Sequence, residues 1–125
     1  MSQYVDANTK PFTAAGTIKQ YARVTLGSGG TITEAGLAVK DIGTAMQPAV
    51  SGDTISVRLR TAMGTHKMIA VEALAIGAAL YTEAAGKVQD TAETTAFQIG
   101  TALEAATADG DIIEVMYNAH GDTAA

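Results

Sequence analysis

The chain has 125 residues, enough for one domain that buries about two-thirds of the surface its unfolded form would expose. Hydrophobic residues make up 47% of it, but Ala and Val dominate, aromatic residues are 5% and Trp is absent, so we expect a thin core that gains from oligomerisation or a partner surface. The formal net charge of −5 argues against a nucleic-acid partner, and the absence of Cys excludes disulfides, thiolate catalysis and Cys-based zinc sites.

The N-terminal part is mixed, polar and aperiodic. No early apolar run follows Met1 and no stretch is long enough to span a bilayer, so we expect neither a signal peptide nor a membrane segment. We predict an extended arm over residues 1–16, with a frayed terminus as the alternative. Two aromatic residues and a Pro in so aromatic-poor a chain favour docking on a partner. The candidate contact residues of the arm are Tyr4, Val5, Lys10, Pro11 and Phe12.

A strand is predicted next, from Thr17 to Leu26, because apolar and polar residues alternate. We place Ala22, Val24 and Leu26 on its buried face, and the polar face then carries Tyr21, Arg23 and Thr25. The glycine-rich segment 27–30 predicts a turn, and residues 31–33 a returning strand.

The segment 41–59 then introduces a motif that occurs twice. Ile-Gly-Thr-Ala begins at Ile42 and again at Ile99, 57 residues later, and Gly-Asp before alternating apolar residues ends at Asp53 and again at Asp111, 58 residues later. Two long copies in register predict one β-hairpin unit used twice. The stretch 76–80, Ile-Gly-Ala-Ala-Leu, resembles a partial third copy.

Between the copies we predict mostly short strands. They cover 66–71, 78–82 and 87–89, with a hairpin turn at 83–86 and a polar loop at 90–96. The run 71–76 is ambiguous, since its Ala and Leu content favours a helix and Gly77 ends it early, so we allow one or two helical turns at most. The sequence therefore predicts a mainly β, compact barrel-like or sandwich-like domain over 17–118, with at most one short helix and a flexible tail over 119–125.

Tests for chemistry find no catalytic, cofactor or metal site. The stretch from Gly77 to Lys87 lacks the spacing of a phosphate loop, and the glycines around Ser28 lack that of a nucleophile elbow. His66 and His120 are best interpreted as surface residues.

Acidic residues near the second copy leave two interpretations open. Asp109, Asp111 and Glu114 could form a weak calcium site, although a solvated loop is the usual meaning of such acids. If the two copies pack together, Arg58 and Arg60 could instead pair with Glu114, contributing at most about 1 kcal/mol. No nucleophile, base and oxyanion site assemble, so we expect a non-enzyme.

The motifs, taken in order, resemble the capsid decoration, or cement, proteins of tailed bacteriophages, over roughly residues 26–116. The stretches that carry this resemblance are Ile42-Gly43-Thr44-Ala45, Gly52-Asp53-Thr54-Ile55-Ser56-Val57, Ala75-Ile76-Gly77-Ala78-Ala79-Leu80-Tyr81, Ala85-Gly86-Lys87-Val88, Ile99-Gly100-Thr101-Ala102-Leu103-Glu104-Ala105-Ala106 and Asp109-Gly110-Asp111-Ile112-Ile113-Glu114-Val115.

This resemblance implies a β-tulip-type fold and a structural role on the virion. It implies homotrimers on the outer surface of an expanded HK97-type shell, at three-fold and quasi-three-fold positions, with the major capsid protein as partner and no nucleic acid, membrane or cofactor. The competing hypotheses are another phage structural β-domain, such as a head fibre base or a tail-associated protein, and a small enzyme or ligand-binding barrel, for which the sequence offers no pocket residues.

Overall fold

The computed structural model describes residues 8–118, and this part of the chain is built from β-strands and one 3₁₀ turn. The predicted mainly β fold is confirmed, and no α-helix occurs among the described residues. In chain order the elements are β1 (Thr9–Thr13), β2 (Arg23–Leu26), β3 (Ile32–Glu34), β4 (Gly43–Ala45), β5 (Thr54–Leu59), β6 (His66–Ala70), β7 (Ala79–Thr82), η1 (Ala84–Gly86), β8 (Lys87–Gln89), β9 (Gln98–Ala102) and β10 (Ile112–Tyr117).

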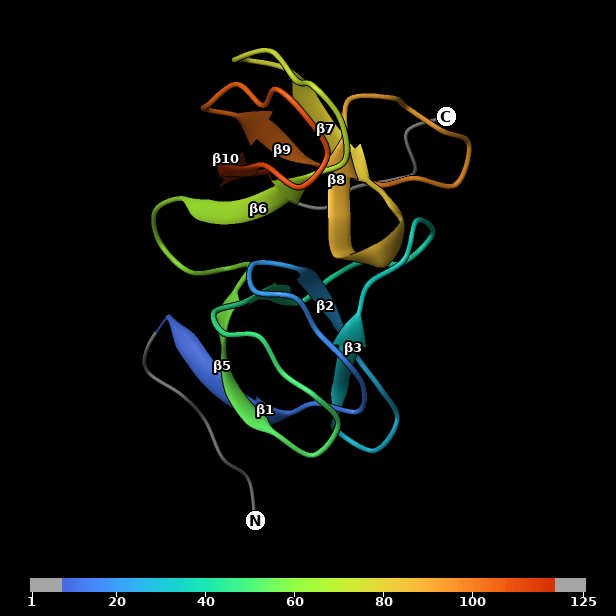
Figure 1. Ribbon diagram of the computed structural model, residues 1–125, viewed down its shortest axis with the longest axis vertical. Coiled ribbons are helices and arrows are strands. Elements are labelled where there is room, and N and C mark those ends of the chain that lie inside the picture. Colours follow the sequence, from blue (N-terminus) through green and yellow to red (C-terminus); the bar gives the residue numbers. More distant parts are fainter. Residues whose placement is uncertain (1–7, 119–125) are drawn as a thin grey trace.

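The strands form two units that follow each other along the sequence. The first unit, residues 8–60, is a five-stranded sheet in the order β1-β5-β4-β2-β3, and the second unit, residues 66–118, is a closed barrel in the order β10-β6-β8-β7-β9. The two units are stacked along the long axis of the molecule and joined by residues 61–65 (Figure 1).

Both units have the same topology and the same strand register. The β2–β3 pair Thr25↔Thr33 corresponds to the β7–β8 pair Tyr81↔Gln89, 56 positions later. The β4–β5 pair Ala45↔Val57 likewise corresponds to Ala102↔Val115 in β9–β10. Even the parallel pair that closes the second barrel, Ala70↔Val88, has a counterpart in the first unit, the isolated parallel bridge Ala14↔Ile32. The repeat predicted as a hairpin therefore extends to a whole five-stranded unit.

The repeated glycines are required where the two strands of each hairpin cross closely. A Cβ on Gly43 would lie 2.1 Å from the carbonyl oxygen of Arg58, and a Cβ on Gly100 would lie 1.9 Å from that of Met116. No side chain fits at these distances because the obstacle is backbone. The Gly of the repeated Ile-Gly-Thr-Ala motif therefore allows the same close backbone approach in both units.

The predicted third copy is wrong. Residues 76–80 correspond to 20–24 of the first unit and not to the Ile-Gly-Thr-Ala motif, because Leu80 pairs with Gly100 as Val24 pairs with Gly43. Gly77 thus occupies the position of Tyr21, and both have positive φ, 85° and 68°. The left-handed conformation that Gly adopts freely is strained for Tyr.

Two further expectations are corrected. Residues 71–76 contain no helix, because Leu74 is drawn into an antiparallel bridge with Ala106 and its backbone bonds go there. The only helical turn in residues 8–118 is η1, inside the predicted 83–86 hairpin turn. Over residues 9–13 the predicted arm is instead β1, which pairs with β5, and Ala14 lies in the core. Residues 1–7 of the predicted arm and the predicted tail at 119–125 lie outside the described residues.

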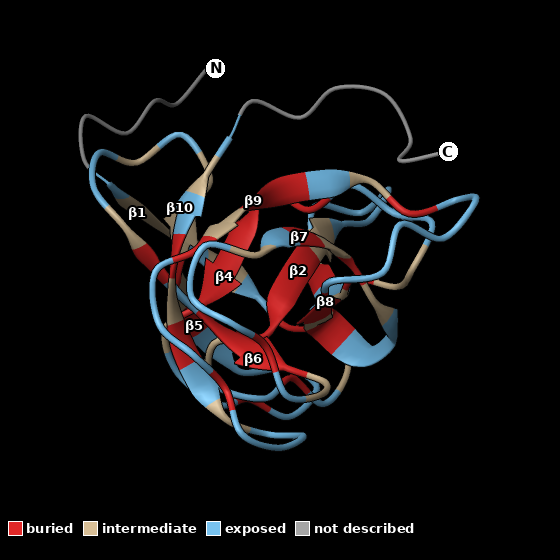
Figure 2. Ribbon diagram, turned by 90° about the horizontal axis from the view of Figure 1, so that it is seen from above, coloured by how far each residue is buried: buried red, intermediate tan, exposed pale blue. Residues whose placement is uncertain are grey.

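Each unit has its own hydrophobic core, made mostly of Ala, Val and Ile. Buried stretches lie in strands such as β2, β4 and β6, and the loops around them are mostly exposed (Figure 2). The cores are joined at one point, since Ile69 of β6 faces away from its own barrel and packs into the core of the first unit. This contact and the polar junction around it hold the two small cores together. No helix within residues 8–118 has the length and apolarity needed to cross a membrane.

Candidate functional site

The most heavily bonded polar group of the described chain is the guanidinium of Arg23, at the junction of the two units. Its side chain is 0% exposed and donates from Nε to the carbonyl of Lys87 at 2.9 Å and from Nη2 to that of Glu83 at 2.6 Å. Nη1 lies 3.3 Å from Oδ2 of Asp41, which is also buried. An arginine of the first unit thus holds the β7–β8 turn of the second.

Tyr117 completes this buried cluster. Its hydroxyl donates to the other carboxylate oxygen of Asp41 at 2.8 Å. Burial, reinforced by the charge of Asp41, raises the pKa of Tyr117 well above its usual value. Burial also lowers the pKa of Arg23, and the nearby Asp41 opposes that shift. These bonds join groups of both units, so the cluster fixes the two units relative to each other.

The sequence prediction missed Arg23, which it placed on a polar, solvent-facing side of its strand. That side is outward with respect to the first unit, but the second unit covers it. A signal was available in the repeat: the counterpart of Arg23 is Ala79, which follows from the pairs Arg23↔Thr44 and Ala79↔Thr101. A charged residue found in only one of two copies marks a role specific to that copy.

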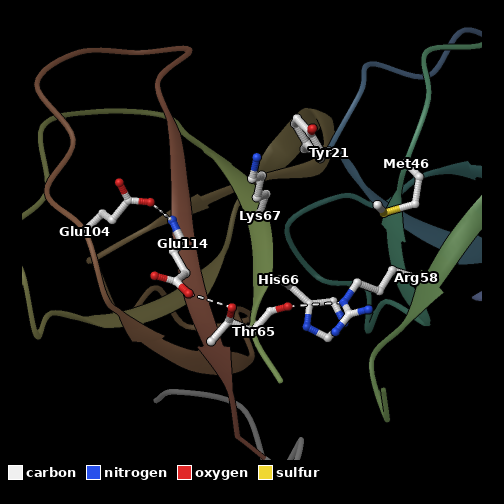
Figure 3. Close-up of a pocket in the computed structure, with 8 residues that line it drawn as sticks. All are labelled: Tyr21, Met46, Arg58, Thr65, His66, Lys67, Glu104 and Glu114. Carbon is white, nitrogen blue, oxygen red and sulfur yellow. Dashed lines mark hydrogen bonds between the residues drawn. The ribbon is translucent and has the colours of Figure 1, made fainter. Parts of the chain in front are cut away.

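A cleft of 410 Å³ lies beside this junction (Figure 3). It is lined by Tyr21, Met46, Arg58, Thr65, His66, Lys67, Glu104 and Glu114. The predicted pairing of Arg58 with Glu114 is replaced by a relay: Arg58 donates to the carbonyl of Thr65 at 3.1 Å, and the Thr65 hydroxyl donates to Glu114 at 2.6 Å. Both charged groups are thereby committed to protein partners, in keeping with a structural cleft.

His66 is buried, which corrects its interpretation as a surface residue. Its Nε2 lies 2.9 Å from the carbonyl oxygen of Leu59, so this nitrogen carries the hydrogen, and its ring packs edge-on against Tyr117. Burial lowers the pKa of His66, since the charged form would lose its hydration. Among residues 8–118 the other ring nitrogen, Nδ1, is buried and has no hydrogen-bond partner. His120 lies outside the described residues.

The acidic residues that were considered as calcium ligands interact with other protein groups. Asp111 accepts from the backbone and hydroxyl of Thr107 at 2.7 and 2.8 Å, which lowers the pKa of its carboxyl group, whereas Asp109 pairs with Lys87 at 2.8 Å. Asp53 makes the same turn-capping bond in the first unit, to the amide of Val50. The repeated Gly-Asp therefore caps a turn, and no cluster of three metal-binding side chains occurs among the described residues.

The predicted contact residues are only partly placed. Lys10, Pro11 and Phe12 lie in β1 at the end of the first sheet, and the Lys10 ammonium stands 4.8 Å from the centre of the Phe12 ring. Tyr4 and Val5 lie outside the described residues. The backbones of Asn8 and Ala14 are hydrogen-bonded to residues next to or in β5. The residues that alternate with them, among them Pro11, therefore direct their backbone groups toward the open edge of β1. Pro lacks an N–H there, which protects the edge against strand pairing.

Comparisons with known proteins now give these features a context. The sequence matches the family model described as phage cement protein over residues 4–117. No curated protein sequence matches the chain. Among solved structures, the head fibre gp8.5 N base of bacteriophage phi29 is similar, with a TM-score of 0.72, 19% sequence identity, and coverage of 88% of this chain and 92% of that chain. At this identity the likeness concerns the fold. Because the family match spans almost the whole sequence, the chain belongs to the phage cement protein family, a family of structural phage proteins.

Proposed function

We propose that this protein binds the outer surface of an expanded HK97-type capsid and stabilises it, with the major capsid protein as its partner. The observation that carries this proposal is the family match over residues 4–117. The similarity in fold to the base of a phage head fibre supports a place on the virion head. We further propose that it acts as a homotrimer at three-fold and quasi-three-fold positions, without catalysis, cofactor, nucleic acid or membrane.

The physical features of the chain suit such a role. A cement protein resists movement between capsid subunits, so it benefits from a body that does not bend. Arg23 donates to two carbonyls of the second unit, Tyr117 of the second unit donates to Asp41, and Ile69 of the second unit sits in the core of the first. In a trimer several weak contacts act at once, and the effective concentration of the later contacts makes their sum tight.

The proposed capsid contact is the N-terminal segment with Tyr4, Val5, Lys10, Pro11 and Phe12. Because Pro11 interrupts the donors of the open edge of β1, we propose that side chains make the contact, without addition of β1 to a capsid sheet. Lys10 and Phe12 form a cation–π pair on the side of β1 that packs against the first core, so the surface they offer to a partner is only partly exposed.

The test is occupancy on expanded, undecorated heads. Removing residues 2–7 leaves β1 intact and is expected to reduce occupancy strongly, as is the pair of substitutions Lys10→Ala and Phe12→Ala. Lys19→Ala is the matched control, since it removes another partly exposed lysine, one that pairs with Glu34 and is not part of β1. Equal occupancy of all variants would remove the N-terminal segment from the proposal, and no binding by the unaltered protein would refute the function.

A head fibre base is the second candidate, favoured by the structural match to the phi29 protein. A fibre base would carry a fibre that projects from the head, whereas a cement protein would form small protrusions close to the capsid surface. Electron microscopy of the virion separates the two.

A further inference from the structure

The junction inside the chain joins two different faces. The first unit contributes face A, the outward side of β2, β4 and β5, which includes Arg23. The second unit contributes face B, the outward side of β6 and the turn between β7 and β8. Arg23 bonds the carbonyls at 83 and 87, the amide of Gly86 donates to Ala35 at 2.8 Å, and Ile69 packs into the first core. Because the two faces differ, the junction is heterologous. Each unit also has a counterpart of the face that the other unit contributes, and this counterpart takes no part in the junction.

Face A of the second unit is uncovered. The row Arg23–Thr44–Arg58 across β2, β4 and β5 has the counterpart row Ala79–Thr101–Met116 across β7, β9 and β10. In the first unit Arg23 and Thr44 are buried, whereas Ala79 is exposed and Met116 is 46% exposed. Met116 is therefore a large exposed apolar side chain in a row whose counterpart is buried at Arg23 and Thr44, and Leu103, 37% exposed, follows this row in the sequence.

Face B of the first unit is uncovered as well. The counterpart of Ile69 is Thr13, which is exposed, and the counterpart of the buried Thr82 is Leu26, which is 50% exposed. In Figure 1, β2 lies on the side of the first unit next to the second, whereas its counterpart β7 lies at the end of the second unit away from the first. The free faces are thus at opposite ends of the molecule.

We propose that copies of this chain associate head to tail, face A of the second unit of one copy against face B of the first unit of the next. The occupant of each free face is a second copy because the same two faces already meet inside every chain. A heterologous contact closes into a ring when its rotation allows. The ring size rests on the proposed function: a trimer would contain six similar junctions, three within chains and three between them.

The junction between copies differs in chemistry from the junction within the chain. Ala79 replaces Arg23 and exposed Gln98 replaces buried Asp41, so the contact between copies has no counterpart of this buried ion pair. Exposed Leu26 and Met116 supply apolar surface in its place. On β1 the outward residues Pro11 and Thr13 face the neighbouring copy, whereas Lys10 and Phe12 have the opposite orientation and remain for the capsid.

Three single variants test the proposal by sedimentation, with thermal unfolding as a check on folding. Leu26→Glu damages face B and Met116→Glu damages face A, and each is expected to be monomeric where the unaltered protein forms a closed oligomer. Met63→Glu is the matched control: Met63 is 83% exposed but lies in the segment between the units, so this variant is expected to assemble normally.

Mixing the two damaged variants is the decisive step. Each retains one intact face, so head-to-tail association predicts a dimer with one copy of each variant and nothing larger. The proposal is overturned if the unaltered protein stays monomeric at high concentration, if either face variant assembles like the unaltered protein, or if the mixture stays monomeric. Capsid occupancy of the unaltered protein is measured separately: oligomers that fail to bind heads refute the proposed function alone, and head binding by a protein that fails the mixing test refutes this inference alone.

Discussion

The two units share one topology but differ at the position where the second covers the first. At the covered face the first unit carries a buried arginine and aspartate, and at the same places the second carries an exposed alanine and glutamine. The common features, such as the crossing glycines and the turn-capping aspartates, therefore reflect the fold of a unit. The residues that differ reflect what each unit touches.

The largest expected effect is that of Arg23→Met. It removes the buried cation that pairs with Asp41, and breaking a buried ion pair in this way costs about 3–5 kcal/mol. Chemical denaturation measures the loss of unfolding free energy. The comparison is sharpened by Ala79→Met at the exposed counterpart, which should change the free energy of unfolding by no more than about 0.5 kcal/mol when both substitutions are measured in the monomeric Met116→Glu background, where face A is free; similar losses at both positions would contradict the special role of the covered face.

The next largest effects come from Gly43→Ala and Gly100→Ala. Each added Cβ would meet a backbone carbonyl at about 2 Å, so the strands must separate, at a cost of about 1–3 kcal/mol or more. The two losses should be similar because the crossings are equivalent. Gly16→Ala, where nothing lies within 4 Å of the added atom, is the control. Denaturation curves that differ widely between Gly43→Ala and Gly100→Ala would break the equivalence of the units.

A smaller effect is expected from Lys19→Ala. Lys19 pairs with Glu34 at 2.8 Å on the surface of the first unit, and its side chain is 44% exposed. Exposed pairs contribute about 0–1 kcal/mol, which salt weakens further. Denaturation at low and high ionic strength should therefore show a small, salt-dependent loss, in contrast to Arg23. A loss as large as that of Arg23→Met would mean that burial does not explain the difference expected between the contributions of the two ion pairs to stability.

The smallest effect concerns the pH dependence of stability. Burial lowers the pKa of His66 in the folded protein below the value of about 6.5 expected for the unfolded chain, so the unfolded state binds the proton more readily. Stability should be unaffected by this group above that value and should fall as pH decreases through it. His66→Gln should make the free energy of unfolding less dependent on pH between about 7 and 5. If the free energy of unfolding of His66→Gln depended on pH as strongly as that of the unaltered protein, a group other than His66 would be responsible for the pH dependence.

Local patterns predicted most of the strands, the turns and the repeated hairpin, because alternation and glycine placement depend on nearby residues. The strand predicted over 17–26 is shorter, since β2 begins only at Arg23 and Tyr21 has a positive φ. The family resemblance was likewise carried by the order of turn motifs, and the family match confirms it. The end of the N-terminal arm was misjudged because β1 has little alternation of its own and becomes a strand only through β5.

The junction was harder to predict for a similar reason. Which outward face of a unit is covered depends on how two units are stacked, and the alternation in 17–26 gives Arg23 the pattern of a solvent-facing residue. His66 was misjudged in the same way. Comparing the two copies position by position would have singled out Arg23 and Asp41, although not the partner that they hold.

The equivalence of the crossings at Gly43 and Gly100 also bears on how the chain folds. Either first strand of a hairpin could pair with the second strand of the other copy, since both offer the same register and the same glycine. Misassembly between similar neighbours is a characteristic hazard of duplicated chains. Arg23 and Asp41, present in one copy only, penalise the exchanged arrangement, in which an arginine would be buried without its carboxylate. The ion pair, because it is present in one copy only, thus favours the correct pairing of strands over the exchanged pairing during folding.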